Sequence, residues 1–397
     1  MKIKTTRTFG VGCIFLMLFL CVFALYPQLI QASNTGTVTV GGTPLTLAIT
    51  PNGKYVYVPN ERSVIAISTT TNTVTATIAA GGAPSHLAIA PNGKNAYVTN
   101  QDGTVSVINI DTNKVTTTIT IGGNPYGVAI TPDGAYAYVA KGDIVDNKAV
   151  GMVSVINTST NTITTTITVG NTPTAVAITP NGKYAYVTNS GSVATSTDIS
   201  GGANGTVSVI SIETNEVVAT IIVERNPGNL AITSDGKNAY VTNLASNSVS
   251  VIDIATNTVK KTITGLSAPN GLALTPKDEY VYLTNGANGT VSVINTATSE
   301  VSAMITVGTD PYGIALTPNG TYAYVTNLVD GTVSVINTAT NMVLSDSSTP
   351  TSPEYPTQLI IISSILAFVI AGALAVIIRK KLWKKYQTST DLGLASS

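Results

Sequence analysis

One irregular repeat dominates the sequence and limits what the chain can fold into. A tyrosine and a proline each recur seven times, and both series advance by the same intervals of 40, 41, 48, 54, 42 and 42 residues. The tyrosines are Tyr57, Tyr97, Tyr138, Tyr186, Tyr240, Tyr282 and Tyr324, and the prolines are Pro44, Pro84, Pro125, Pro173, Pro227, Pro269 and Pro311. Two separate markers with one uneven spacing indicate a tandem array of seven units, and a period of this length is typical of propeller blades.

Each unit contains four short runs of β-forming residues. In the second unit, the turn Asn92-Gly93 separates the first two runs, 87–90 and 96–100. Asn-Gly between β runs predicts a tight hairpin turn of the primed type, in which both residues adopt positive φ. In the fourth unit, Tyr184 and Tyr186 face one side of the second run, and alanine and valine face the other. Both faces are therefore apolar, so each sheet needs a neighbour on both sides, and a ring of sheets provides them. The sequence predicts an all-β, seven-bladed β-propeller of four-stranded blades.

The two ends of the array predict how the ring closes. The last unit stops at 341–344, so its fourth strand is short, whereas 37–44 matches the end of a fourth strand at 119–125. We expect the N-terminal strand to complete the seventh sheet, which removes an unpaired edge. The intervals of 48 and 54 residues come from insertions between second and third strands, at about 141–151 and 190–205. These are expected to form enlarged loops on one rim, where binding surfaces usually lie.

The segments that flank the array predict export and membrane anchoring. Residues 1–32 combine basic residues with a long apolar run, which indicates a secretory signal peptide or an uncleaved signal anchor. The propeller is expected at 33–344, and a Ser/Thr/Pro-rich stalk at 345–358. The uncharged stretch 359–378 is long enough to cross a bilayer as a helix. The basic segment 379–397 predicts a cytoplasmic tail, with the propeller outside at the cell surface.

Charge and cysteine content argue against several functional classes for the array. Residues 33–358 contain 12 Lys and Arg against 19 Asp and Glu, a net charge of about −7. No basic stripe runs through the repeats, so nucleic acid is not an expected partner. Both cysteines, Cys13 and Cys21, lie in the first apolar run, which leaves the repeats without a thiolate metal site or a haem attachment sequence. No cofactor is predicted.

Several second strands share the core Tyr-Val-Thr-Asn, as at 97–100, 186–189, 240–243 and 324–327. These cores resemble the YVTN β-propeller repeat family, which is common in archaeal surface-layer and other exported envelope proteins. The resemblance covers 36–344 and implies a seven-bladed propeller at the cell surface. Propellers of similar repeat type include lactone hydrolases and haem- or quinone-carrying enzymes as well as proteins that only bind or cover.

A second resemblance concerns the segment before the apolar helix. Residues 353–357 read Pro-Glu-Tyr-Pro-Thr and precede an apolar stretch and a basic cluster. This order is similar to the tripartite sorting signal that archaeosortase-type enzymes process. Tyr355 stands where such signals usually have phenylalanine, and the chain continues beyond the basic cluster.

Five polar residues are predicted to line a small pocket at the mouth of the central channel. They follow the opening prolines of their units by one or two positions, and they are His86, Tyr126, Asn229, Asn270 and Tyr312. His86 is the only histidine, and an imidazole suits acid and base chemistry near neutral pH. With no cysteine and no carboxylate motif beside it, His86 is otherwise interpreted as a half-exposed loop residue.

Other polar residues are given structural or surface roles. Asn100 and its equivalents end the second strands, where asparagine tolerates left-handed backbone. The marker tyrosines are interpreted as packing residues. Asp143, Asp146 and Asp198 lie in the insertions without an ordered calcium-loop spacing, so no metal site and no catalytic residue is predicted. Sequons that export would make available for glycosylation occur at Asn157, Asn204 and Asn288.

The functional hypothesis from sequence is a membrane-anchored extracellular propeller that is not an enzyme. It would act as a binding, adhesion or envelope-covering module whose protein or glycan partner at the cell envelope meets the rim with the insertions. The alternative is an exported, lactonase-like hydrolase or cofactor-bearing enzyme that uses the central channel. Carboxylates or a metal at the channel would favour the enzyme, and a bare channel with a broad loop platform would favour binding.

Overall fold

The structure, a computed structural model, describes residues 36–145, 148–191 and 204–344. The chain divides into two compact units, Met1–Asp346 and Ser347–Ser397, and all described residues belong to the first. The predicted signal sequence, stalk, apolar helix and basic tail lie outside the described residues, as do Asp146 and Asp198. Within the described ranges, no helix is long and apolar enough to cross a membrane.

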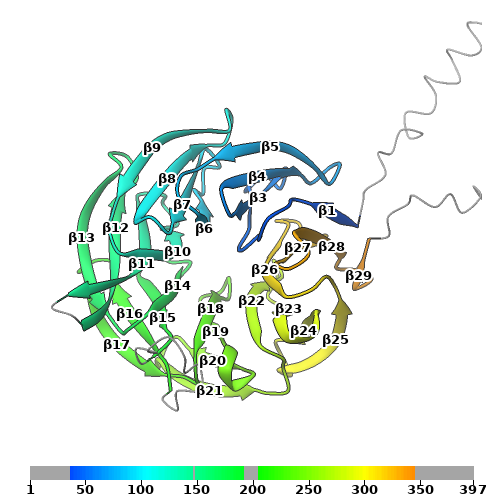
Figure 1. Cartoon of the computed structure of the whole chain (residues 1–397). Coiled ribbons are helices and arrows are strands. Elements are labelled where there is room, and N and C mark those ends of the chain that lie inside the picture. The colour runs from blue at the N-terminus through cyan, green and yellow to red at the C-terminus, as the bar shows by residue number, and fades with distance from the viewer. Residues whose placement is uncertain (1–35, 146–147, 192–203, 345–397) are drawn as a thin grey trace, which may run out of the picture. The chain divides into compact units, whose positions relative to one another are not determined.

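Seven antiparallel sheets form a ring, which confirms the predicted seven-bladed propeller (Figure 1). Six blades contain four consecutive strands each. Blades one to three consist of β2 (Ala48–Ile49), β3 (Tyr55–Asn60), β4 (Ser63–Ser68) and β5 (Thr73–Ala79); β6 (Pro84–Ile89), β7 (Asn95–Asn100), β8 (Thr104–Asn109) and β9 (Lys114–Thr120); and β10 (Asn124–Ile130), β11 (Tyr136–Val145), β12 (Lys148–Asn157) and β13 (Thr162–Val169).

The remaining blades follow the same order. Blades four to six consist of β14 (Pro173–Ile178), β15 (Tyr184–Asn189), β16 (Thr206–Ser211) and β17 (Glu216–Ile222); β18 (Pro227–Ile232), β19 (Asn238–Asn243), β20 (Ser248–Asp253) and β21 (Thr258–Ile263); and β22 (Pro269–Leu274), β23 (Tyr280–Asn285), β24 (Thr290–Asn295) and β25 (Glu300–Thr306). Blade seven contains β26 (Pro311–Leu316), β27 (Tyr322–Asn327) and β28 (Thr332–Asn337), and two short strands complete it. In every blade the first strand lines the centre and the fourth lies outside (Figure 1).

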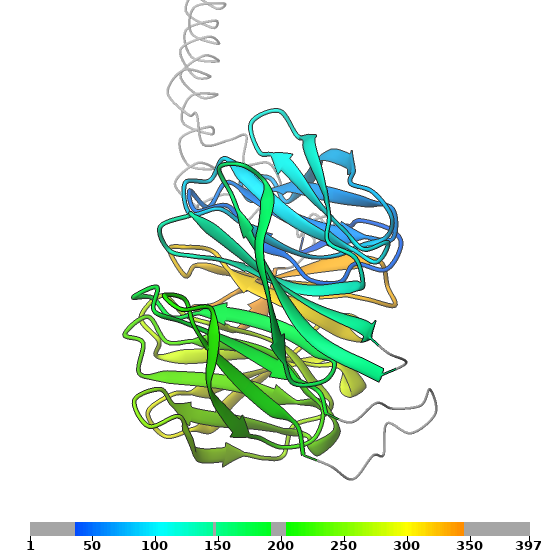
Figure 2. The ribbon, with the colours of Figure 1, turned by 90° about the vertical axis from the view of Figure 1, so that its left-hand side faces the viewer.

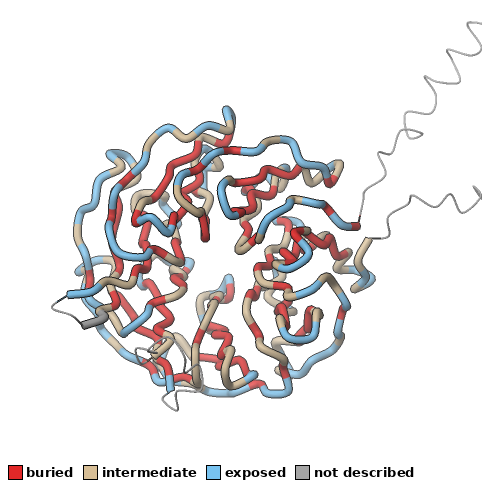
Figure 3. Tube along the Cα trace, viewed as in Figure 1, coloured by how far each residue is buried: buried red, intermediate tan, exposed pale blue. Residues whose placement is uncertain are grey.

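The hydrophobic core lies between blades rather than within one. Between blades one and two, for example, Tyr57 and Val64 of one sheet pack with Leu87 and Val98 of the next. Equivalent clusters occupy the other junctions, and the buried residues follow the inner three strands of each blade (Figure 3). Each buried Val or Leu contributes about 1.5–3 kcal/mol. The two apolar faces of each sheet are therefore the reason that the sheets form a closed ring.

The two ends of the described chain share the fourth strand of blade seven. Strand β1 (Thr37–Thr39) pairs with one half of β28, and β29 (Met342–Val343) pairs with the other. The halves meet at Val335, whose N–H donates to the Gly36 carbonyl at 2.9 Å and whose carbonyl accepts from the Leu344 N–H at 2.8 Å. Closure by an N-terminal strand is confirmed, and the structure adds that a C-terminal half-strand completes the edge.

The hairpin turns differ from the predicted primed type. In the first unit the Gly53 N–H donates to the Thr50 carbonyl at 2.7 Å, and only Gly53 has positive φ, of 71°. Pro51 explains the difference, because its ring holds φ near −65° and starts an ordinary turn that the glycine then ends. The Asn52 side chain accepts from the Lys54 N–H at 3.0 Å instead of adopting left-handed backbone.

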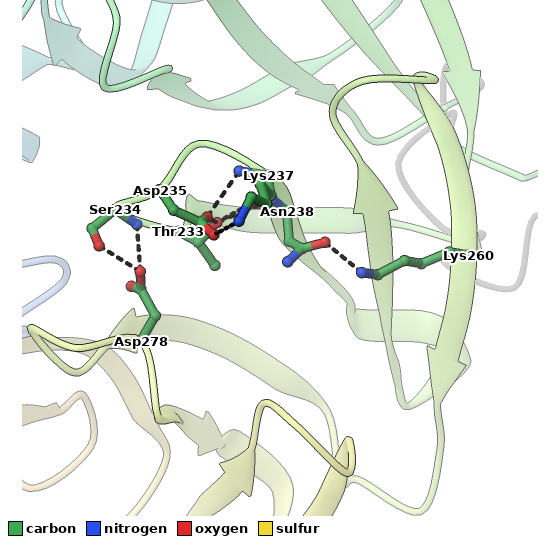
Figure 4. Close-up of polar contacts among 7 residues, drawn as sticks. All are labelled: Thr233, Ser234, Asp235, Lys237, Asn238, Lys260 and Asp278. Carbon is green, nitrogen blue, oxygen red and sulfur yellow. Dashed lines mark hydrogen bonds and ion pairs between the residues drawn. The ribbon is translucent and has the colours of Figure 1, made fainter.

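The same turns form a second set of contacts between blades. A Cβ added to Gly93 would lie 3.6 Å from the Cδ of Pro51 in the preceding blade, and most junctions repeat this proline–glycine contact. The junction of blades five and six has neither residue. There Asp278 accepts from the N–H of Ser234 at 2.7 Å and from its Oγ at 2.6 Å (Figure 4). Ser234 in place of the proline and Asp278 in place of the glycine therefore meet at one junction, where hydrogen bonds replace the packing contact.

The first insertion forms strand rather than loop. Strands β11 and β12 continue to pair through Val145 and Lys148, so blade three carries a lengthened hairpin (Figure 2). The prediction of an enlarged loop there is wrong, because β-branched residues such as Ile144 and Val150 favour extended structure. Ile144 is 74% exposed near the tip. Most of the second insertion lies outside the described residues.

Candidate functional site

The marker tyrosines connect neighbouring blades. Their side chains are buried, as predicted for packing residues, and six of the phenols donate to an asparagine in the turn between the third and fourth strands of the next blade. These pairs are Tyr57–Asn113 at 2.6 Å, Tyr97–Asn161 at 2.9 Å, Tyr138–Asn215 at 2.9 Å, Tyr186–Asn257 at 2.6 Å, Tyr282–Asn341 at 2.6 Å and Tyr324–Asn72 at 2.7 Å. Burial raises the pKa of Tyr57 to about 12, so the phenol remains a neutral donor.

The asparagines that end the second strands are structural for a different reason from the one predicted. Asn243 has an extended backbone with φ of −118°, so tolerance of left-handed backbone does not explain its place. In blade two, Asn100 donates through Nδ2 to Thr104 Oγ1 and to Ser106 Oγ, both at 2.9 Å. The amides of Asn189, Asn243, Asn285 and Asn327 fasten their second strands to the third in the same way, whereas the amide of Asn60 donates to the Val40 and Gly41 carbonyls.

Blade three has lysine in place of this asparagine. Lys141 is 6% exposed, and its Nζ donates to the Ile121 carbonyl at 2.7 Å and lies 3.5 Å from Asp143 Oδ2. Ser154, which corresponds to Ser106, has a buried Oγ with no hydrogen-bond partner. The lysine satisfies the neighbouring carbonyl but leaves the serine hydroxyl unpaired.

The first strands of the blades enclose a channel cavity of about 140 Å³. The lining position two residues after each proline is occupied by Thr46, His86, Gly127, Ala175, Asn229, Gly271 and Gly313. Small residues dominate because the inner strands approach closely: a Cβ on Gly271 would lie 2.3 Å from the Tyr312 carbonyl oxygen. Thr46, His86 and Asn229 are the polar side chains at this level.

A second cavity of about 140 Å³, the mouth cavity, adjoins the first. Its lining includes all five residues of the predicted pocket, His86, Tyr126, Asn229, Asn270 and Tyr312. The structure thus brings them together, and their functional role stays a prediction. Sequence reasoning missed Thr174, although it directly follows a proline as Tyr126 does. It also missed Leu244, which no repeat position marks because it begins the short helix η2 (Leu244–Ser246).

His86 lies in strand β6 and not in a loop, so its expected place in a loop is wrong, whereas its expected partial exposure is confirmed. The ring meets Tyr126 edge to face, with 6.1 Å between centroids and 73° between planes. Its Nδ1 is buried and has no hydrogen-bond partner. Desolvation lowers the pKa of His86 to about 4, so the imidazole is neutral at physiological pH.

The opposite part of the mouth cavity holds a short chain of hydrogen bonds. Asn229 Nδ2 donates to Asn270 Oδ1 at 2.9 Å. Burial raises the pKa of Tyr312, and a hydrogen bond with Asn270 opposes this shift. Beside His86, the phenol of Tyr126 accepts from Asn124 Nδ2 at 3.0 Å. The site thus combines one neutral base with amides and phenols that can donate or accept.

The other predicted sites lie away from this cavity. Among the described residues, no three His, Cys, Asp or Glu side chains gather to hold a metal ion. Asn204 and Asn288 are exposed, the latter in η3 (Gly286–Asn288). Asn157 ends β12, and its Oδ1 accepts from Ser159 Oγ at 2.7 Å. Glycosylation of these three asparagines stays a prediction.

Comparisons with known proteins agree with the fold and add a functional class. A family model described as "Lactonase, 7-bladed beta-propeller" matches residues 157–303. That segment contains Asn229 and Asn270 but not His86, Tyr126 or Tyr312. No curated protein matches the sequence significantly.

Two solved structures illustrate the similarity in fold. Hydrazine Synthase from Kuenenia stuttgartiensis has 23% identity and a TM-score of 0.65, covering 79% of this chain and 98% of its own. The Cps50 (Swd1) β-propeller domain from Myceliophteria thermophila has 12% identity and a TM-score of 0.61, covering 74% and 96%. The protein is therefore a seven-bladed β-propeller protein. The part of it that matches a family model resembles lactonases.

The lactonase match overturns two expectations from the sequence. The chain was expected to be a binding, adhesion or envelope-covering module and not an enzyme, whereas the match indicates an enzyme-type propeller. The error has a physical origin. A propeller builds a central site from one or two residues per blade, about 40 residues apart, so no local catalytic motif marks it. The resemblance to surface-layer repeats, the sorting signal and an envelope partner stay predictions.

Proposed function

We propose that the protein is a lactonase-type hydrolase that opens cyclic esters in the mouth cavity. The match of residues 157–303 to the lactonase family carries this proposal. Two features of the cavity support it: the neutral imidazole of His86, and the amide and phenol groups of Asn229, Asn270 and Tyr312 on the same lining.

The proposed reaction adds water across the ring ester. Neutral His86 takes a proton from a water molecule, and the resulting hydroxide attacks the lactone carbonyl carbon. An amide or phenol donor such as Asn229 or Tyr126 hydrogen-bonds the oxyanion that forms. The ring C–O bond then breaks, the alkoxide receives the proton from His86, and the product is the open hydroxy acid.

A single weak base and a few hydrogen-bond donors are better suited to hydrolysis of a lactone than of an amide. A base contributes about 10²–10⁴-fold and one well-placed oxyanion donor about 10²–10³-fold. A histidine with a pKa of about 4 is a weak base, and no described carboxylate lines either cavity to strengthen it. A small-ring lactone holds its ester in the strained, more electrophilic geometry, so it requires less assistance than a peptide or an open-chain ester.

The test is hydrolysis of matched esters by the purified full-length protein. We expect an uncharged δ-lactone to be opened faster than the corresponding open-chain ester, with acid release followed in a pH-stat. His86→Gln should lower kcat/KM for the lactone about 100-fold, whereas Lys183→Gln, a change in an exposed turn far along the chain, should not. Lactone opening no faster than in buffer would contradict the proposal.

We further propose that the propeller is exported and held on the outer side of the membrane. The support is the sequence of 1–32, the Ser/Thr/Pro-rich 345–358, the apolar 359–378 and the basic 379–397. The full-length protein should stay with membranes through carbonate extraction, and protease added to intact cells should cut it. Replacing 359–378 with a Gly/Ser segment should release it. Quantitative recovery of the unchanged chain in the soluble fraction would contradict membrane anchoring.

A further inference from the structure

The linings of both cavities carry polar groups but no permanent charge. The mouth cavity presents histidine, tyrosine, asparagine and threonine side chains beside proline, glycine and leucine, and the channel cavity adds small and aliphatic residues. Neither lining contains Lys, Arg, Asp or Glu. His86 is the only residue of these linings that protonation would make cationic, and its lowered pKa keeps it neutral.

The rim around the mouth cavity is acidic. This rim consists of the connections between blades and of the ends of the hairpins formed by second and third strands, including the lengthened hairpin of blade three. Its described side chains include six carboxylates, Glu61, Asp102, Asp143, Glu224, Asp310 and Asp330, against the cationic Arg62, Lys141 and Arg225. Lys141 is buried and bound to Ile121 and Asp143, and Arg225 donates to the Ala245 carbonyl at 3.4 Å.

An anionic ligand would find little compensation in this site. Phosphate and carboxylate groups are usually held by Arg or Lys, which replace the water that the anion loses. An anion that is desolvated without such a partner is bound weakly, and the acidic rim adds repulsion at low salt. Asn and Tyr groups donate and accept, which matches the hydroxyl groups of a neutral ligand.

We infer that the mouth cavity selects uncharged, hydroxyl-bearing lactones and discriminates against lactones that carry a phosphate or a carboxylate. That the ligand is a lactone rests on the proposed hydrolase function. The neutral lining and the acidic rim set the charge preference itself, which applies to binding as well as to turnover.

The first experiment compares glucono-δ-lactone with its 6-phosphate ester as substrates of the full-length protein. We expect kcat/KM to be about 100-fold higher for the neutral lactone, from the unpaired anion in the site. Equal values, or a preference for the phosphate ester, would overturn the inference and leave the hydrolase function intact. If neither is opened, the hydrolase proposal fails, and calorimetry with gluconolactam and its 6-phosphate decides the charge preference: tighter binding of the phosphate, or no binding of either, overturns it.

The second experiment adds a cation to the mouth. Leu244 lines the cavity, so Leu244→Lys should raise the relative affinity for the phosphate ester about tenfold. The matched control is Val329→Lys, because Val329 is 65% exposed in a loop of the same rim and does not line the cavity. An unchanged preference in a Leu244→Lys protein that keeps the melting temperature of the wild type, or an equal change in the control, would count against the inference.

Discussion

The marker tyrosine and the channel position each occur once in every blade, but the residue is constant at the first position and varies at the second. The tyrosine is present in every blade and is buried against the next one. The position two residues after each proline has no consensus and holds Thr, His, Gly, Ala or Asn in the channel. A constant residue at a repeated position indicates what the ring needs in order to close. A variable one shows where the ring permits chemistry.

Removal of the closing strand should have the largest effect on the constant part of the molecule. Deleting 36–40 exposes the edge of β28 and removes the buried Val38. Lost burial and ladder hydrogen bonds together amount to about 5 kcal/mol, so we expect the melting temperature to fall by roughly 10–15 °C. The control is Thr37→Ala/Thr39→Ala, which alters only exposed side chains of β1. Its melting temperature should differ from that of the wild type by about 2 °C or less. An unchanged melting curve for the deletion would rule out closure by this strand.

The pH dependence of activity should show the protonation of His86, which occupies one of the variable channel positions. A base must be neutral to act, and desolvation lowers the pKa of His86 from 6.5 to about 4. The acid limb of kcat/KM for a neutral lactone should therefore lie near pH 4, not near pH 6.5. Since the unfolded chain binds the proton first, the wild type should also lose stability as the pH falls from about 6.5 to 4, and His86→Gln should lose less. A limb centred near pH 6.5 would mean that the ring is solvated.

A smaller difference in stability is expected between phenylalanine substitutions at two of the marker tyrosines. Tyr324 donates to Asn72 across the closure, whereas the turn opposite Tyr240 carries Ser299 at the position of the asparagine. Tyr324→Phe should reduce the free energy of unfolding by about 1–2 kcal/mol, and Tyr240→Phe by less than about 0.5 kcal/mol. Chemical denaturation of the two variants measures this difference. Equal losses would mean that the asparagine contributes nothing.

The smallest effect concerns the exceptional junction of blades five and six. Asp278→Gly removes the acceptor of two hydrogen bonds from Ser234 and should lower stability by about 1 kcal/mol. Ser234→Pro/Asp278→Gly restores the proline–glycine contact of the other junctions and should regain most of the loss. A double-mutant cycle of unfolding free energies gives the coupling. Additive losses would show that the two substitutions are independent.

The sequence predicts the constant part of the fold well and the variable part only in outline. The spacing of the tyrosines and the two-sided apolar strands are sufficient for blade number, strand order and closure. The prediction failed where one residue overrides a local rule, as Pro51 does in the turn. It also failed where pairing lengthens strands, as at β11 and β12.

The candidate site was predicted by position but not by environment. Counting from the prolines brought His86 and its four companions together, because the repeat carries equivalent residues to one end of the channel. Neither the burial of Nδ1 nor the Asn229–Asn270 hydrogen bond can be read from spacing, since both depend on contacts between blades. For the same reason a lactonase-like enzyme was only the alternative from the sequence, although the family match favours it.

The most direct test of this division compares two substitutions in blade two. His86→Gln and Tyr97→Phe are assayed side by side for lactone kcat/KM and for melting temperature. Tyr97 lines neither cavity and donates to Asn161 of the next blade at 2.9 Å. His86→Gln should lose about 100-fold in kcat/KM and keep its melting temperature, and Tyr97→Phe should melt earlier and keep its kcat/KM. If His86→Gln retains full kcat/KM, or both substitutions change the same quantity, the assignment of chemistry to the variable channel positions is wrong.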